Sequence, residues 1–166
     1  MSTLHTRSAS WVANADPGGL VYGAIIAAAV LATVSAHAEA YEHVAISAGF
    51  VVGTYWMAHV YVDALSHQFR GDTHQFLHRL RAAVSRETGI LKGGIPAIVV
   101  YVVAALAGAD KSSAASFAVY FSVVLLFCAG CLGAHQAGIS GKGLVAEGLG
   151  AASFGVLIVI AKTFLH

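Results

Sequence analysis

Three ionisable side chains recur at four-residue steps within one largely apolar stretch: His59, Asp63 and His67. Residues four apart lie on the same face of an α-helix. Two imidazoles and a carboxylate on one face could hold a divalent metal ion or pass protons, because both tasks need groups that titrate or offer lone pairs near neutral pH. A structural alternative stays open. In it, Asp63 and His67 are solvated where the helix leaves its apolar surroundings, and His59 bonds a neighbouring carbonyl or serine.

Two other groups of ionisable residues interrupt the apolar runs. His135 and Glu147 lie at or just inside the last two runs, where a carboxylate needs a polar partner or must stay protonated. The other group lies between the first two runs and contains His37, Glu39, Glu42 and His43. We expect these four either to attract cations to the mouth of a pathway or to form an ordinary solvated turn.

The composition indicates the solvent in which these groups lie. Of the 166 residues, 58% are hydrophobic and only 10% are charged. Soluble domains carry about 25% charged residues, so this chain has too few polar side chains to cover a surface in water. The composition therefore predicts an integral membrane protein. A net charge of +1 argues against a nucleic-acid partner, which needs a concentrated basic face.

Five apolar stretches are long enough to cross a bilayer, which takes about 20 residues of helix. Backbone polar groups in lipid must be satisfied within the segment, so each stretch is expected to be helical. The third is the least regular, because Lys92, Gly93, Gly94 and Pro96 interrupt its first turns. The sequence thus predicts an all-α membrane helix bundle in one domain, with spans at about 17–38, 41–69, 89–108, 112–135 and 143–164.

The first span has a marked beginning and an ambiguous end. Asp16-Pro17 supplies a capping side chain followed by proline at the first helical position. Ala36-His37-Ala38 resembles the small-residue cleavage site of a signal peptide. No basic cluster directly precedes the apolar run, however, so we expect a retained helix.

Residues 72–88 form a basic, amphipathic segment between the second and third spans. Its apolar residues recur at helical spacing, and basic residues are interleaved with them. Such a helix lies on the membrane surface or extends the third span into the cytosol, where its arginines would contact anionic lipid or a protein partner. The apolar residues are Phe76, Leu77, Leu80 and Val84, and the basic ones are Arg79, Arg81 and Arg86.

Positive charge is divided unevenly between the two ends of five such spans. Lysine and arginine are enriched in cytoplasmic segments, so the richer side indicates the cytoplasm. The sequence therefore predicts a cytoplasmic amino terminus and an external carboxyl terminus. The predicted inner side holds Arg7, Arg70, Arg79, Arg81, Arg86, Lys92 and Lys142, and the outer side holds Lys111 and Lys162.

This topology places four ionisable residues at a similar depth near the cytoplasmic boundary: His59, Asp63, His135 and Glu147. We expect them to converge on a pathway for ions or protons. If a divalent metal ion is bound, its candidate ligands are His59, Asp63 and His67.

Helix association in lipid relies on small residues that let two backbones approach closely. Glycines four residues apart occur at 19 and 23, at 49 and 53, and at 89 and 93. We favour Gly49 and Gly53 as a packing face because they lie mid-span, and also Gly148 and Gly155 in the last span. The same small residues could instead form the interface of a homo-oligomer.

Short patterns along most of the chain resemble a set of small, uncharacterised polytopic membrane proteins of high-GC Gram-positive bacteria. They are Leu20-Val21-Tyr22-Gly23, Tyr55-Trp56-Met57-Ala58-His59, Arg86-Glu87 followed by Gly94-Ile95-Pro96, and the ending Lys162-Thr163-Phe164-Leu165-His166. The resemblance implies a bacterial plasma membrane and no particular activity.

Three functions are compatible with the sequence. A small cation or proton channel or carrier, acting as an oligomer, would use the predicted inner group and the outer acidic turn. A non-catalytic accessory or scaffold subunit would use the basic segment to meet lipid or a partner protein. A membrane enzyme would use His59 and Asp63 as an acid–base pair, but no motif indicates a reaction.

Overall fold

The computed structural model describes residues 17–69 and 76–165, which include the whole of every predicted span but none of residues 1–16 and 70–75. Arg7, Arg70 and the first four residues of the predicted amphipathic segment lie outside this described part. Within it the chain is all-α, as the sequence predicts. The helices are α2 (Pro17–His37), α3 (Tyr41–Phe69), α4 (Phe76–Arg86), α5 (Thr88–Leu106), α6 (Lys111–Gln136) and α7 (Lys142–Leu165).

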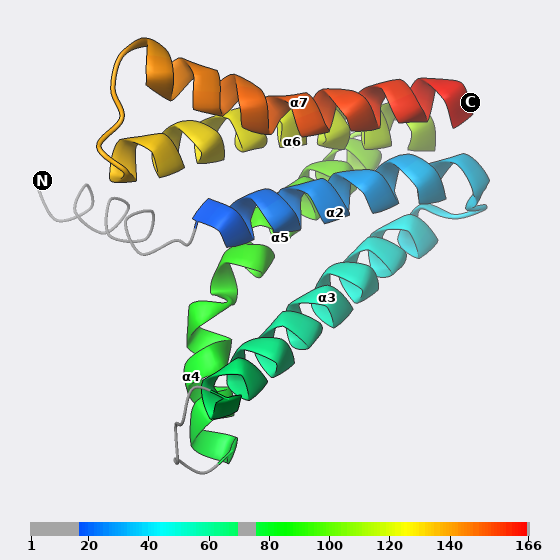
Figure 1. Ribbon diagram of the computed structural model, residues 1–166. Helices are drawn as coiled ribbons and strands as arrows, with labels where there is room; N and C mark the ends of the chain where they lie inside the picture. Colours follow the sequence, from blue (N-terminus) through cyan, green and yellow to red (C-terminus); the bar gives the residue numbers. More distant parts are fainter. Residues whose placement is uncertain (1–16, 70–75, 166) are drawn as a thin grey trace, which may run out of the picture.

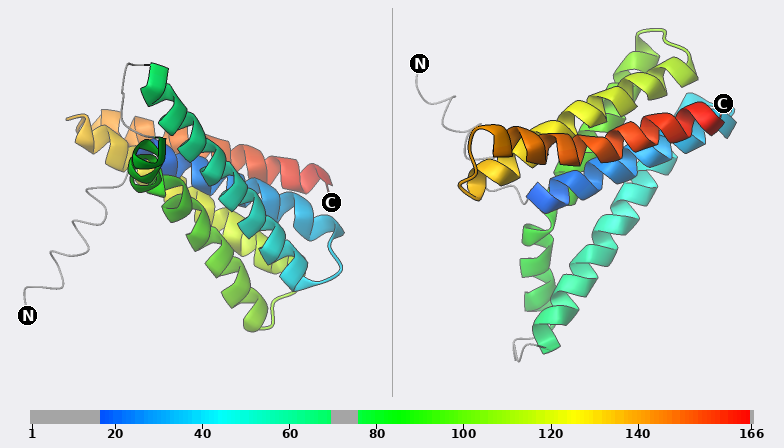
Figure 2. Two further views of the ribbon diagram at one scale, coloured as in Figure 1. Left: turned by 90° about the horizontal axis from the view of Figure 1, so that it is seen from below. Right: turned by 45° about the horizontal axis from the view of Figure 1, so that its top comes forward.

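Five of these helices, all but α4, are long and apolar enough to cross a membrane. Four of the five, α2, α5, α6 and α7, run side by side as a bundle (Figures 1 and 2). Helix α2 is central, because it packs against α3, α5, α6 and α7. We call the two ends of the bundle the Lys111 end, where α6 begins, and the Lys142 end, where α7 begins.

Small residues bring α2 and α5 into backbone contact. A Cβ placed on Gly19 would lie 3.0 Å from the Cα of Gly89, and one on Gly23 would overlap the carbonyl oxygen of Ile90. From the other side, a Cβ on Gly93 would overlap the carbonyl oxygen of Leu20. The glycines of α5 therefore do not interrupt the helix but allow its close approach to α2, and α5 is continuous from Thr88 to Leu106 in spite of Pro96.

The prediction for Gly49 and Gly53 is wrong. A Cβ on either residue would meet nothing within 4 Å, so neither lies at a packed interface within the chain. The prediction for the last span is confirmed, because a Cβ on Gly148 would crowd Cys131 and Phe127 of α6. Gly155 likewise packs on α6. Mid-span position alone therefore does not select the packing glycines; what decides is which face of the helix meets a neighbour.

Helix α3 leaves the bundle along its length. Its first half packs on α2 and α5 through the buried residues Val44, Ala48 and Val52. Its second half diverges, and Val60 and Ala64 pack instead against α4 (Figure 1). At 29 residues, α3 is about 43 Å long at about 1.5 Å per residue, against about 30 Å of hydrocarbon. A helix of this length crosses such a bilayer with a strong tilt, which agrees with its divergence from the bundle (Figure 1).

Helix α4 runs crosswise to the bundle, near the Lys142 end (Figures 1 and 2). If the bundle axis follows the membrane normal, α4 lies along the membrane plane, as the amphipathic pattern predicts. Leu77 is 70% exposed and Phe76 is 43% exposed, whereas Ala83 is buried against α3. The helix therefore has one face on the protein and an apolar face left for lipid.

Helix ends are fixed by turns that need particular residues. Gly108 and Gly138 adopt positive φ after α5 and α6, the conformation that glycine adopts without strain. Asp110 caps α6 by accepting a hydrogen bond from the backbone N–H of Ser113 at 3.1 Å. Lys111 Nζ donates to the carbonyl oxygens of Ala38 and Glu39, at 2.7 and 2.8 Å, and so ties α6 to the end of α2.

Candidate functional site

A line of polar side chains follows the second half of α3 and gains one residue from each of two other helices. We call it the polar stripe. It occupies the α3 face that also carries Ala48 and Val52, because steps of three, four and seven residues return to one side of a helix. The polar stripe therefore lies on the side of α3 that faces the bundle, in the second half of the helix, where α3 diverges from the bundle. Its members are Tyr22 of α2, Tyr55, His59, Asp63 and His67 of α3, and Arg86 of α4.

The end of the stripe nearer the bundle is a cluster of three rings. The Tyr55 and His59 ring centroids are 4.6 Å apart, with the ring planes at 66°. Tyr22 crosses from α2 to meet both rings, with its centroid 5.9 Å from that of His59 and 6.4 Å from that of Tyr55. Edge-to-face contacts of this kind are favourable and fix ring orientation.

The other end of the stripe is an ion pair between α3 and α4. Arg86 places Nη2 2.8 Å and Nε 2.9 Å from Oδ2 of Asp63. His67 Nε2 lies 3.6 Å from the other carboxylate oxygen. The pair is partly exposed, with side-chain exposures of 47% for Arg86 and 22% for Asp63. It orients the end of α4 towards α3, but it is worth at most about 1 kcal/mol at this exposure.

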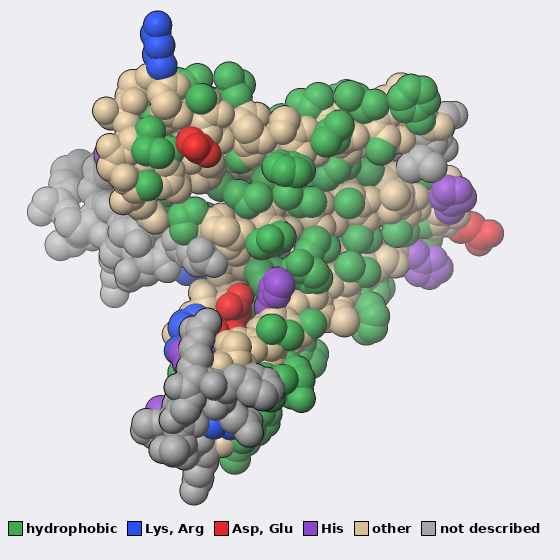
Figure 3. Space-filling view, viewed as in Figure 1, with side chains coloured by type: hydrophobic (Ala, Val, Ile, Leu, Met, Phe, Trp, Pro, Cys, Tyr) green, Lys and Arg blue, Asp and Glu red, His purple; other side chains and the backbone are tan. Residues whose placement is uncertain are grey.

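The stripe lies in the angle between α2 and α3. Figure 3 shows acidic, basic and histidine side chains gathered there, between two surfaces dominated by hydrophobic side chains. The ring nitrogens of His59 and the hydroxyls of Tyr22 and Tyr55 make no hydrogen bond to another described residue. Their donors and acceptors are therefore not used within the described part of the chain.

The predicted metal ligands share a face, but the structure does not assemble them into a metal site. Among the described residues, no group of three or more His, Cys, Asp or Glu side chains could hold a metal ion. The physical reason lies in the partners: Asp63 is engaged by the Arg86 guanidinium, and the His59 ring packs against Tyr22 and Tyr55.

The expected convergence of the four inner residues does not occur. His59 and Asp63 lie on the diverging half of α3, which packs against α4. His135 and Glu147 are exposed on α6 and α7, which pack chiefly against each other and α2. Residues predicted at the same depth in different spans are not therefore close together. The tilt of α3 carries His59 and Asp63 away from α6 and α7.

The predicted outer group lies at the α2–α3 turn, at the Lys111 end. His37, Glu39, Glu42 and His43 are all exposed there. His37 Nδ1 is 3.3 Å from the carbonyl oxygen of Thr33, and the carbonyl of Glu39 accepts a hydrogen bond from Lys111. Their side chains remain available to solvent, which fits the solvated turn and leaves the cation mouth as a prediction.

The three arginines of α4 do not share one contact surface. Arg79 is only 8% exposed, so it is unavailable to lipid or a partner in this arrangement. Arg86 is committed to Asp63. Arg81 is exposed, beside the exposed Leu77 and Val84 of an apolar groove of about 380 Å³. The three arginines therefore point to different sides of α4. The number of basic residues in the segment does not predict this division.

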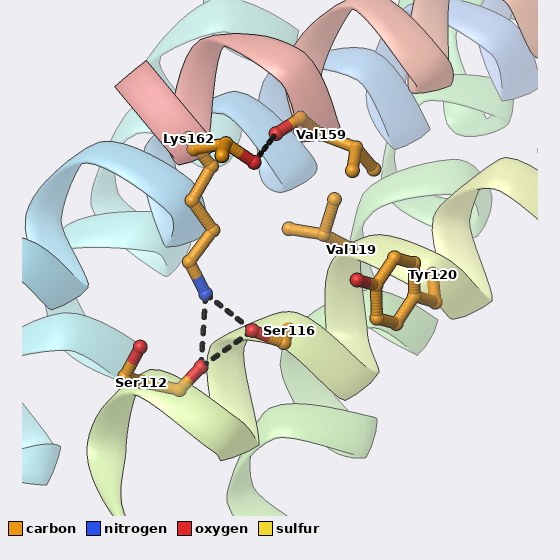
Figure 4. A pocket seen from close by; sticks show the side chains of 7 residues that line it. Ser112, Ser116, Val119, Tyr120, Val159 and Lys162 are labelled. Carbon is orange, nitrogen blue, oxygen red and sulfur yellow. Dashed lines mark hydrogen bonds between the residues drawn. The ribbon is translucent and has the colours of Figure 1, made fainter. Parts of the chain in front are cut away.

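A second polar site, at the Lys111 end, was not singled out from the sequence. It is a pocket of about 190 Å³ between α6 and α7, lined by Ser112, Ser116, Tyr120, Val159, Lys162 and Thr163 (Figure 4). We call it the Lys162 pocket. The available indication was a lysine inside the last apolar run, together with serines four apart at the start of the preceding one. In the sequence, Lys162 predicts only the orientation of the spans, as one of the outer charges, and no pocket.

The fold and these sites together define the class of the protein: an all-α bundle of the integral membrane type, with five helices long and apolar enough to cross a membrane, a crosswise amphipathic helix and a polar stripe in the angle beside it. No protein-family model, curated protein or solved structure matches the chain.

Proposed function

We propose that the protein is a non-catalytic subunit of a membrane complex, and that the angle between α2 and α3 binds a transmembrane helix of another membrane protein. The observation that carries this proposal is the polar stripe on the bundle-facing side of α3, at the place where α3 parts from the bundle and only Tyr22 of α2 and Arg86 of α4 reach that side. A side chain such as Asp63 or His59 facing lipid is costly, so such positions are usually turned to protein or water.

The chemistry of the stripe suits a helix as occupant. Unpartnered hydroxyl and imidazole groups can form hydrogen bonds to polar side chains of a neighbouring helix, which stabilise helix pairs in lipid. The basic, amphipathic α4 adds a surface at the membrane boundary, where Arg81 would meet anionic headgroups.

Site-specific photo-crosslinking in native membranes tests the proposal. Benzoylphenylalanine at Tyr22 or Tyr55 should give one discrete adduct with a different protein. The same probe at Phe154 or Leu157, which are 53% and 60% exposed on α7, should give none and serves as the matched control. Adducts from all four positions, or no protein adduct from the stripe, would contradict the proposal. An adduct with the mass of two copies would favour a homo-oligomer instead.

A second candidate is an oligomeric path for protons or cations. The observation favouring it is that His59, Asp63 and His67 form an unbroken run of titratable groups along the angle. At the other end of α3, the angle is closed by the apolar contacts of Val44 and Ala48, so a complete path would need an assembly of several copies.

Flux measurements in proteoliposomes separate this candidate from the first. Asp63→Asn should abolish proton or cation flux, whereas Glu147→Gln should leave it unchanged because Glu147 is exposed on α7, away from the stripe. Absence of any flux from the wild-type protein, or equal flux from wild type and Asp63→Asn, would refute the path.

We also propose a bacterial plasma membrane with the Lys142 end in the cytoplasm. Lys92, Lys142 and the described arginines of α4 gather towards that end, and Lys111 and Lys162 lie at the other. Reporter fusions after residue 138 and after residue 109 should report the cytoplasmic and external sides, respectively. The reverse pattern would invert the assignment.

A further inference from the structure

The ammonium group of Lys162 is turned into the protein at the end of the last span. The residue is only 8% exposed, and its Nζ donates to the carbonyl oxygen of Ser112 at 2.8 Å and to Oγ of Ser116 at 2.7 Å (Figure 4). A lysine so near a membrane boundary would ordinarily extend its amine into the headgroup layer. Here the side chain instead forms the floor of the Lys162 pocket.

The charge on Lys162 is not neutralised by an ion pair. No carboxylate of the described residues lies within 4.0 Å of its Nζ, and Asp110 is the acidic group that acts on it from further away. An ammonium group also has three N–H donors, of which two are used. A buried cation with a spare donor is stabilised by an anion that brings both negative charge and an acceptor oxygen.

The remaining wall of the pocket offers a second donor. The hydroxyl of Tyr120 makes no hydrogen bond to another described residue, and Tyr120 lines the same pocket (Figure 4). Ser116 is already occupied, because its hydroxyl donates to the carbonyl of Ser112 at 2.8 Å. The Thr163 hydroxyl is likewise bonded to the carbonyl of Val159 at 3.0 Å. The free donors of this lining are therefore those of Lys162 and Tyr120, with the Ser112 hydroxyl as a third.

The position and size of the pocket narrow the choice of anion. Its volume of about 190 Å³ exceeds the roughly 150 Å³ of an engineered cavity that holds benzene, so a phosphate group fits but a whole lipid does not. The pocket opens at the surface of the protein, since Tyr120 of its lining is 57% exposed and Thr163 is also exposed. Acyl chains could therefore remain in the bilayer while the headgroup enters the pocket.

We infer that the Lys162 pocket binds the phosphate of a phospholipid with a net negative headgroup, in the leaflet at the Lys111 end. Lys162 and Tyr120 donate to the phosphate oxygens, and Ser116 holds the ammonium in place. A choline headgroup is disfavoured, because it would bring a second cation close to Lys162.

Native mass spectrometry of the purified full chain, titrated with phosphatidylglycerol or phosphatidylcholine, tests this inference. The wild-type protein should bind phosphatidylglycerol at least tenfold more tightly than Lys162→Met does, and more tightly than it binds phosphatidylcholine. Lys142→Met removes an exposed lysine from the opposite end of the same helix and should bind like the wild type. Equal binding by wild type and Lys162→Met would overturn the inference, as would an equal loss in Lys142→Met.

Two further measurements separate lipid binding from a folding defect and from the binding of free phosphate. Tyr120→Phe removes one hydroxyl from an exposed residue, so it should fold normally and still lose at least threefold in affinity for phosphatidylglycerol. Unchanged affinity in this variant would contradict the site even if Lys162→Met fails to fold. Millimolar inorganic phosphate should not displace the lipid. Displacement by phosphate would show that the pocket takes free phosphate rather than a headgroup.

Discussion

The contact between α2 and α5 makes the stability of the bundle sensitive to a single methyl group at Gly23. A Cβ there would overlap the carbonyl oxygen of Ile90 and lie 2.8 Å from the backbone nitrogen of Gly94. Both atoms belong to a helix backbone, so they cannot rotate away as a flexible side chain would. The helices must separate, and overpacking of this kind costs about 1–3 kcal/mol.

Helix propensity opposes this loss and sets the net effect. Alanine favours a helix over glycine by at most about 1 kcal/mol. Because the clash is with backbone, we take the upper part of the overpacking range and expect Gly23→Ala to destabilise the fold by about 2 kcal/mol. Gly49→Ala is the matched control. It adds the same methyl group where nothing lies within 4 Å, so it should be neutral or stabilising by up to about 1 kcal/mol.

Reversible unfolding in mixed micelles, followed by helical circular dichroism while the fraction of denaturing detergent is raised, measures both variants. The two free energies of unfolding should differ by about 2–3 kcal/mol, with Gly23→Ala the less stable. If Gly23→Ala is as stable as the wild type, or if Gly49→Ala loses as much, then close α2–α5 contact is not what holds the bundle.

Three further predictions concern polar contacts. Hydrogen bonds from Ser113 hold the pKa of Asp110 below its usual range, so its stabilising contribution is present above the ordinary pKa and is lost as pH falls through the lowered one. Acid unfolding curves should show this loss for the wild type and not for Asp110→Asn. Lys111→Met removes both bonds to the carbonyls of the α2–α3 turn and should lower the free energy of unfolding by about 1 kcal/mol in the same micelle assay, with no effect contradicting that role. For Asp63 and Arg86, a double-mutant cycle with Asp63→Asn and Arg86→Gln should give a coupling of at most about 1 kcal/mol; a larger value would mean that the pair is less solvated than its exposure indicates.

The helices themselves could be predicted because length and apolar composition determine spans almost without reference to tertiary structure. Segment boundaries agree within a few residues, and the crosswise amphipathic α4 follows from its spacing of apolar residues. The role of a glycine could not be predicted in this way. The sequence predicts that Gly93 interrupts the third span and that Gly49 packs against another helix. In the structure Gly93 permits contact with Leu20, and a Cβ on Gly49 would meet nothing within 4 Å. What decides these roles is the neighbouring helix.

For the candidate site too, the sequence predicts which residues share a helix face but not which residues of other helices they contact. That His59, Asp63 and His67 share a face follows from helical periodicity. The partners of these three residues do not follow from periodicity, because they depend on the tilt of α3. That tilt brings Asp63 to Arg86 and takes it away from Glu147. Tilt is set by packing against other helices, so depth along a span is insufficient to place two residues together.

The two ends of the molecule are held by different kinds of interaction, and this difference bears on how a partner could bind. At the Lys111 end, side chains reach backbone carbonyls of other helices. Lys111 ties α6 to the α2–α3 turn, Lys162 ties α7 to α6, and the Tyr101 hydroxyl of α5 lies 3.5 Å from the carbonyl of Tyr41 on α3. At the Lys142 end, α3 is held to α4 by the Asp63–Arg86 pair and apolar contacts.

The angle between α2 and α3 therefore widens away from the end where the spans are joined, and at its wide end α4 and the first turns of α5 connect the two helices (Figure 1). A helix that enters this angle meets the polar stripe without displacing any of the contacts at the Lys111 end. Its binding free energy is then opposed mainly by desolvation of the stripe and by ordering of the partner, and not by disruption of the bundle. For the same reason, substitutions such as His59→Phe or Tyr55→Phe should weaken association with a partner while leaving the free energy of unfolding within about 1 kcal/mol of the wild type. A variant that lost both together would show that the stripe stabilises the subunit itself, and the proposal of a partner in this angle would fail.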